Sequence, residues 1–105
     1  MRNLTEAMPM PVVELDRDNR ITFANGAAEQ LFGAGRQRLR ERSLAEVLAP
    51  GSPLIQLLEH VRAKGGSVTE YGIDVSASKA TKGDQVADIY AAPLVDSPDH
   101  LLLVI

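Results

Sequence analysis

The sequence predicts one α+β domain, in which a five-stranded antiparallel sheet has short helices packed on one face. One supporting observation is the chain length of 105 residues, which suits a single ordinary domain. The other is the order of local patterns along the chain: two strands, three short helices and then three strands. Separate runs of strands and helices are typical of α+β domains with antiparallel sheets.

The first two strands are predicted at residues 12–16 and 20–24, where short apolar or alternating patterns occur. The intervening Arg17-Asp18-Asn19 predicts a turn, because Asp and Asn tolerate the left-handed backbone region. The two strands should therefore form a hairpin. Before them, residues 4–8 predict a short helix that ends at Pro9 and Pro11.

The first of the three central helices should begin after Asn25, whose side-chain oxygen is a good N-cap acceptor. It should run through Phe32 and end at Gly33, where a residue with positive φ is favoured. Its apolar face contains Ala27, Ala28, Leu31 and Phe32, spaced by three or four residues.

Two further helices are predicted at residues 43–48 and 53–64. Ser43 and Glu46 match the capping-box pattern, which predicts a side-chain cap at Ser43. Ser52 precedes a proline at the first helical position, and Gly65 follows the last helical residue. The apolar stripe of the longer helix is Leu54, Leu57, Leu58 and Val61.

The C-terminal part predicts three strands, at residues 67–76, 86–95 and 101–105, joined by a polar loop at 79–84 and a tight turn at 96–99. In the first of them, alternation places Thr69, Tyr71, Ile73 and Val75 on one face, and Glu70, Asp74 and Ser76 on the other. The last segment is apolar throughout, which favours a central strand over a short buried helix.

Composition limits the function. The net charge of −3 gives no broad basic field for nucleic acid or anionic lipid, so neither is an expected partner. The absence of cysteine excludes disulfides, thiolate metal sites and a cysteine nucleophile. No apolar run approaches the roughly 18 residues that span a bilayer, and no signal-peptide pattern is present, so we expect a cytoplasmic domain.

Four arginines alternate with other residues between positions 36 and 42. One interpretation is a small patch that binds an anion or a partner. The other is a solvated loop or helix face, which the nearby Glu41 and Glu46 favour.

The local sequences at residues 8–16, 20–33 and 43–48 resemble the first strand, the second strand with its following helix, and the next short helix of the PAS family. The resemblance covers nearly the whole chain and implies a PAS fold. Two departures are Asn19, where the family often has glycine, and Gly26, where it often has proline; both suit a turn or a helix start.

Residues 51–54, 61–76 and 91–94 are similar to the N-terminal domain of the nitrogen-regulation histidine kinases (NtrB) of the alphaproteobacterial type. This resemblance implies a homodimeric, cytoplasmic two-component kinase whose catalytic domains lie after residue 105. It also implies a response regulator as partner and control by the PII signalling protein. The alternative is a ligand-sensing PAS domain of another regulator, such as a transcription factor or a cyclic-dinucleotide enzyme.

The sequence gives little support for a catalytic site or a metal site. His60 and His100 lack the neighbours of a phosphoacceptor motif, and two histidines on separate elements do not suit a metal site. His60 also lies off the apolar stripe of its helix, which favours a surface histidine over a haem ligand. We therefore expect no enzyme activity, no metal and no cofactor in this segment.

A PAS fold places a possible small-ligand cavity between the sheet and the helices. The candidate lining residues are Phe23, Asn25, Leu31, Phe32, Val61, Ile73 and Tyr90. Because nearly all are large and apolar, a packed interior is favoured over a polar ligand cage. The leading hypothesis is thus an interaction and dimerisation module, with residues 1–10 as its dimerisation segment; the second is a small-molecule sensor.

Overall fold

A computed structural model describes residues 10–76 and 85–105 of the chain. The helix predicted at residues 4–8 and the loop predicted at 79–84 lie outside these ranges. Within them, five strands form one sheet, and all adjacent strands are antiparallel, as predicted. The strands are β1 (Val12–Leu15), β2 (Ile21–Ala24), β3 (Val68–Asp74), β4 (Val86–Pro93) and β5 (Leu101–Val104).

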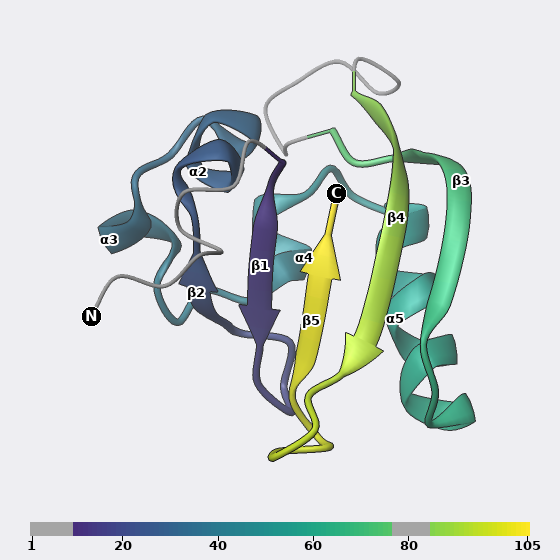
Figure 1. Cartoon of the computed structure of the whole chain (residues 1–105). Helices are drawn as coiled ribbons and strands as arrows, with labels where there is room; N and C mark the ends of the chain where they lie inside the picture. The colour runs from purple at the N-terminus through teal and green to yellow at the C-terminus, as the bar shows by residue number, and fades with distance from the viewer. Residues whose placement is uncertain (1–9, 77–84) are drawn as a thin grey trace.

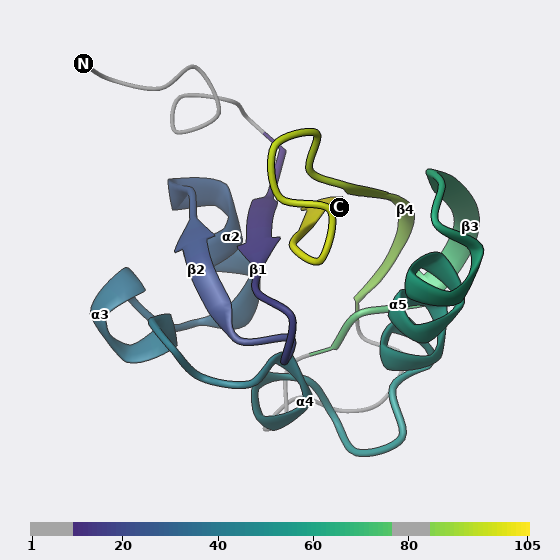
Figure 2. The ribbon, with the colours of Figure 1, turned by 90° about the horizontal axis from the view of Figure 1, so that it is seen from below.

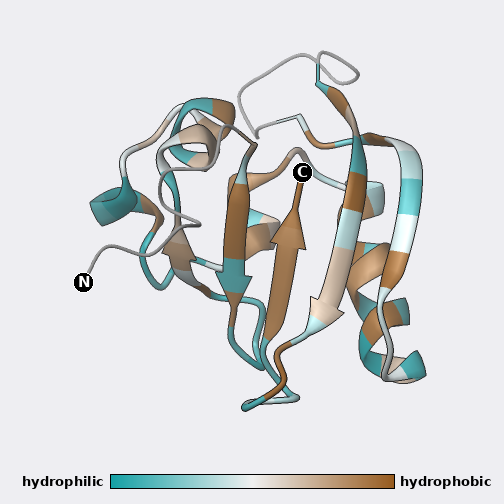
Figure 3. Ribbon diagram, in the orientation of Figure 1, coloured by the Kyte–Doolittle hydropathy of each residue, from teal (hydrophilic) through white to brown (hydrophobic). Residues whose placement is uncertain are grey.

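The strand order is β2-β1-β5-β4-β3, so the last strand of the chain is the central one (Figure 1). Figure 3 shows β5 as apolar along its whole length, which fits a strand with neighbours on both sides. The predicted central position of residues 101–105 is confirmed. The order also leaves β2 and β3 as the two edges of the sheet.

Four helices follow β2 and precede β3 in the sequence: α2 (Gly26–Phe32), α3 (Arg36–Leu39), α4 (Leu44–Val47) and α5 (Pro53–Lys64). Seen from below, α4 and α5 lie on one side of the sheet, while α3 lies beyond the β2 edge (Figure 2). The predicted helices at 43–48 and 53–64 correspond to α4 and α5. The single turn of α3 was not predicted, because three of its four residues are polar and it has no apolar stripe.

The core lies between the sheet and the helices. Alternate strand residues such as Val13, Leu15 and Leu103 are fully buried on the helix-facing side. The predicted stripe of α5 packs against them, with Leu54, Leu58 and Val61 all inaccessible to solvent. Full burial of one such side chain contributes roughly 1.5–3 kcal/mol. Hydrophobic burial on one sheet face therefore holds α5 in place.

The predicted caps of α2 and α5 are confirmed. Asn25 accepts a hydrogen bond from the Ala28 backbone, and the Ser52 hydroxyl accepts one from Leu54. Both helices end at glycine in the left-handed region, Gly33 with φ of 68° and Gly65 with φ of 79°.

The side-chain cap predicted at Ser43 was wrong. The Ser43 side chain makes no capping hydrogen bond, although α4 begins at the next residue. Instead, the Leu44 N–H donates to the carbonyl of Asn19 over 2.8 Å, and Ser43 forms a backbone bridge with Arg20. The β1–β2 turn thus supplies the acceptor for the first N–H of α4, while the Glu46 N–H, which a capping box would pair with the Ser43 side chain, donates to the Ser43 carbonyl over 3.0 Å.

The alternation predicted for residues 67–76 was also wrong. The pairing of β3 with β4 is interrupted between Glu70 and Ile73, and Gly72 there has a φ of 66°. Such an irregularity changes the face on which later side chains lie. Tyr71 is therefore 74% exposed rather than sharing a buried face with Val75, which is fully buried.

Candidate functional site

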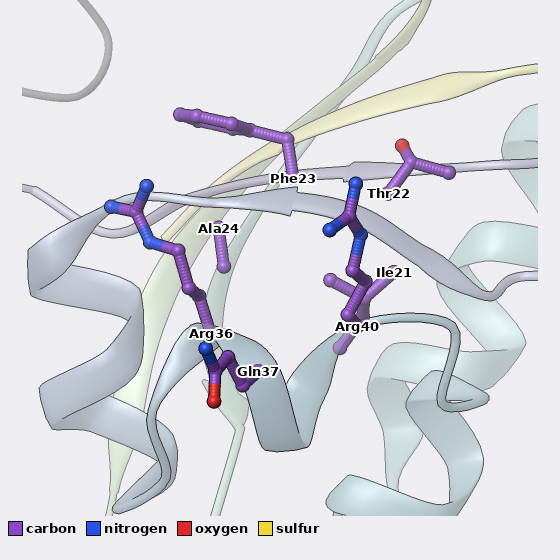
Figure 4. A pocket seen from close by; sticks show the side chains of 7 residues that line it. All are labelled: Ile21, Thr22, Phe23, Ala24, Arg36, Gln37 and Arg40. Atoms are coloured by element: carbon purple, nitrogen blue, oxygen red, sulfur yellow. The ribbon is translucent and has the colours of Figure 1, made fainter.

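A groove of about 370 Å³ lies between the edge strand β2 and the short helix α3 (Figure 4). Figure 4 shows the side chains of Arg36, on α3, and of Arg40, which follows α3, pointing toward β2, with Ala24 between them in this view. The lining residues are Ile21, Thr22, Phe23, Ala24, Arg36, Gln37 and Arg40.

A register shift in the first hairpin shapes the strand side of the groove. Val13 pairs with Ala24 and Leu15 with Ile21, although the pairing slips by one residue between Glu14 and Leu15. As a result, Ile21 and Ala24 both face the core and are buried. Thr22 and Phe23 project from the opposite face of β2 (Figure 4).

The helix side of the groove depends on Leu39, whose buried side chain anchors α3. The carboxylate of Glu29 also fixes the start of α3, because it accepts a hydrogen bond from the Arg36 backbone over 2.6 Å. It further pairs with the Arg36 guanidinium at 3.8 Å. Arg36 is the first residue of α3 and Arg40 is the C-cap residue that follows the helix, and both side chains line the groove (Figure 4).

The predicted cavity residues are distributed over several places. Phe32 and Val61 belong to the buried core cluster, and the partly buried Leu31 and Ile73 pack against it. Phe23 lines the groove at β2, and Tyr90 is 42% exposed on the sheet face opposite the core. The structure thus gathers four of the seven around the core and places Phe23 and Tyr90 elsewhere.

Asn25, the remaining predicted cavity residue, is completely buried. Its side-chain oxygen accepts hydrogen bonds from the backbones of Val12 and Ala28, each over 3.0 Å. Its amide nitrogen donates to the Met10 carbonyl over 2.9 Å. Asn25 therefore joins the start of β1 to the start of α2, with its polar atoms engaged in the fold.

Sequence reasoning missed Arg36, Gln37 and Arg40 as lining residues of one groove. The four-residue spacing of the two arginines was the available signal, but it requires a helix at residues 36–39 to become meaningful. In the described part of the chain, the Arg40 side chain is exposed and forms no hydrogen bond or ion pair.

A polar cluster also lies in the β1–β2 turn. The Asp16 carboxylate accepts hydrogen bonds from the backbones of Asp18 and Arg20, over 2.8 and 2.9 Å. Burial by itself raises the pKa of Asp16, but these two bonds and the positive charge of Arg20 outweigh it, so the pKa lies below its ordinary value.

The described residues contain no cluster of three or more potential metal-ligating side chains. His60 is exposed on α5, as predicted from its position off the apolar stripe of the helix. No helix within the described ranges is long and apolar enough to cross a membrane.

A family model for the PAS fold matches residues 1–105. This chain belongs to the PAS family. The α+β fold with a five-stranded antiparallel sheet and helices on one face, expected from the sequence, is thereby confirmed.

The PAS chain is similar to sensory histidine kinase/phosphatase NtrB of Rhizobium meliloti, with 34% identity over 93% of this chain and 25% of that protein. NtrB of Rhizobium leguminosarum bv. phaseoli is 36% identical over the same shares. The chain thus spans about a quarter of the length of these relatives. The similarity to NtrB expected from the sequence is confirmed, and it favours the NtrB-type interpretation over another regulator.

A solved PAS domain shares the fold. The structure of the PAS domain of nitrogen regulation protein NR(II) from Vibrio parahaemolyticus superposes with a TM-score of 0.75. Its sequence is 23% identical, and the match covers 96% of this chain and 90% of that one.

Proposed function

We propose that this PAS domain is the regulatory and dimerisation module of a cytoplasmic two-component histidine kinase in nitrogen regulation. The observation that carries the proposal is the similarity to NtrB kinases along 93% of the chain. In this proposal the catalytic kinase domains lie elsewhere in the parent protein, and residues 1–105 form a single regulatory domain without chemistry of its own.

An apolar sheet face supports the dimerisation part of the proposal. Residues that alternate with the core positions lie on the face away from α4 and α5. Their pairing brings Tyr90 opposite Val104, and Ala92 opposite Leu102. Leu102 and Val104 are only partly buried, although they occupy the central strand. A central strand with partly exposed apolar side chains is suited to cover a second apolar surface.

The second subunit is the occupant we propose for this face, together with residues 1–10 of each chain. Two-fold symmetry lets the same patch meet itself, so one apolar face is sufficient for a closed dimer. Through the parent kinase, the further partners are the response regulator and the PII signalling protein. The domain would regulate the kinase by changing the relative orientation of the two subunits.

Sedimentation velocity tests the dimer. We expect the 105-residue chain to sediment as a dimer at micromolar concentration, and Tyr90→Glu and Leu102→Glu to shift it toward monomer. A charge placed at the core of an interface is strongly disfavoured. The matched control is Gln56→Glu, because Gln56 is exposed on α5. Circular dichroism establishes that each variant is folded.

The kinase part needs the parent protein. Replacement of residues 1–105 by an unrelated dimeric module should preserve autophosphorylation but abolish its response to PII. A parent protein without kinase activity, or one whose PII response survives the replacement, would refute the proposed regulatory role.

A further inference from the structure

We propose that the groove between β2 and α3 binds an extended acidic segment of a partner protein. The segment adds a strand along the open edge of β2 and places its carboxylates on Arg36 and Arg40. This interaction surface goes beyond the proposed dimer, since it lies at the β2 edge rather than on the helix-free sheet face.

The edge of β2 offers backbone groups for strand addition. β2 pairs with β1 on one side only. In the described chain its other backbone hydrogen bonds are made at Ile21, whose N–H donates to the Arg42 carbonyl and whose carbonyl accepts from Glu41, each over 2.9 Å. The edge from Thr22 to Ala24 therefore remains open. Open strand edges are templates for an added strand, and main-chain hydrogen bonds supply much of the affinity.

The charge beside this edge is positive, although the whole chain is acidic. Residues 36–42 contain four arginines and one glutamate, whereas the net charge of the chain is −3. Arg40 is exposed and has no side-chain partner in the described chain. The Arg36 side chain is 51% exposed, and its contact with Glu29 at 3.8 Å is a weak surface pair. A carboxylate can approach both guanidinium groups, which form short, bidentate hydrogen bonds with such acceptors.

The lining of the groove suits an extended acidic peptide better than nucleic acid. Its volume of about 370 Å³ lies at the small end for ligand sites. The buried Ile21 and Ala24 give it an apolar floor, while Arg36 and Arg40 rise beside β2 (Figure 4). An extended peptide alternates its side chains, so acidic residues can meet the arginines while its backbone follows β2. Nucleic acid would need a longer basic surface than one helical turn.

Amide NMR of the isotope-labelled chain tests the proposal. The probe is an acetylated and amidated hexapeptide of alternating glutamate and valine. We expect saturable shifts at residues 22–24 and 36–40. The peptide with glutamine in place of glutamate should bind at least roughly tenfold more weakly, because charged hydrogen bonds are about twice as strong as neutral ones. N-methylation of every second residue of the peptide removes half of its backbone N–H donors. Of the two possible sets of alternate residues, methylation of the set that faces β2 should abolish binding.

Two arginine variants, one within α3 and one at its C-cap, form a matched pair. Arg40→Gln should weaken binding of the acidic peptide roughly five- to tenfold, as expected for the loss of one charged hydrogen bond. Arg38→Gln removes the same charge from the same exposed helix but not from the groove lining, and should change affinity less than about twofold, as expected for a screened surface charge.

Three results would overturn the proposal. Absence of saturable shifts would indicate that the arginines only prevent edge-to-edge pairing between copies of the domain. Equal shifts with succinate would indicate an anion site without strand addition. Equal losses in Arg38→Gln and Arg40→Gln would indicate general electrostatic attraction rather than the groove.

Discussion

The guanidinium of Arg62 on α5 holds the side chain of Asn19 in the β1–β2 turn. Its Nε and Nη2 atoms donate to Asn19 Oδ1 over 3.2 and 2.5 Å, and Nη2 also donates to the Asp16 carbonyl over 2.7 Å. Its Nη1 atom reaches the carbonyl of Asp99 in the β4–β5 turn over 2.5 Å. One side chain thus connects the end of α5 with both turns at this end of the sheet.

Replacement of Arg62 by lysine should lower the free energy of unfolding by about 1–2 kcal/mol, because lysine keeps the charge but loses the planar fork that reaches both turns. Urea denaturation measures the change. The control is Arg17→Ala, which removes an exposed ion pair with Asp99 at 3.7 Å and should cost less than about 1 kcal/mol. Equal effects of the two variants would contradict the bridging role.

Asn25→Ala should be among the most damaging polar substitutions. It removes the α2 cap and leaves the Val12 N–H and the Met10 carbonyl without their partner. We expect a loss of roughly 2–4 kcal/mol in the free energy of unfolding. Ser43→Ala is the matched control, because Ser43 makes no capping bond, and it should change stability by less than about 0.5 kcal/mol. Comparable losses would mean that the capping assignments are wrong.

Two glycines near α2 should respond in opposite directions. Gly33→Ala should destabilise by about 1 kcal/mol, because its φ of 68° is unfavourable for alanine. Gly26→Ala lies at the first residue of α2, and an added Cβ would meet nothing within 4 Å. This change should be neutral or stabilise by up to about 1 kcal/mol. Thermal melts of both variants check the prediction, which fails if the two changes have the same sign.

Asp16 should give the stability a specific dependence on pH. Its pKa is lower in the folded chain than in the unfolded chain. The contribution of Asp16 to the free energy of unfolding is therefore fully present above the unfolded pKa of about 3.9. It is lost as the pH falls through the lower folded pKa. The stability difference between the natural chain and Asp16→Asn should narrow below about pH 4. Urea midpoints between pH 6 and 3 measure it; a constant difference would contradict the assignment.

Much of the fold follows from local patterns. The turn at Asn19, the caps at Asn25 and Ser52, and the apolar run at 101–105 each carry a signal within a few residues. The errors arose where a distant segment changed a local preference. The Asn19 carbonyl accepts from the first N–H of α4, where the Ser43 side chain makes no cap, and the irregular pairing at Gly72 displaced the alternation of β3.

The groove at β2 was harder to predict. It depends on a register shift in β1–β2, which places both Ile21 and Ala24 on the core side, and on a one-turn helix that has no apolar stripe. The hydrogen bonds of Arg62 join residues up to 46 positions apart. Single-sequence periodicity contains no information about such distant pairs.

Native mass spectrometry of the purified chain tests the central claim most directly, because one spectrum gives both the number of subunits and any bound mass. We expect a dimer with no added mass, because a regulatory interaction module with a packed core holds no small molecule. A monomer would contradict the dimerisation role, and a reproducible extra mass of a small molecule would identify a ligand sensor instead.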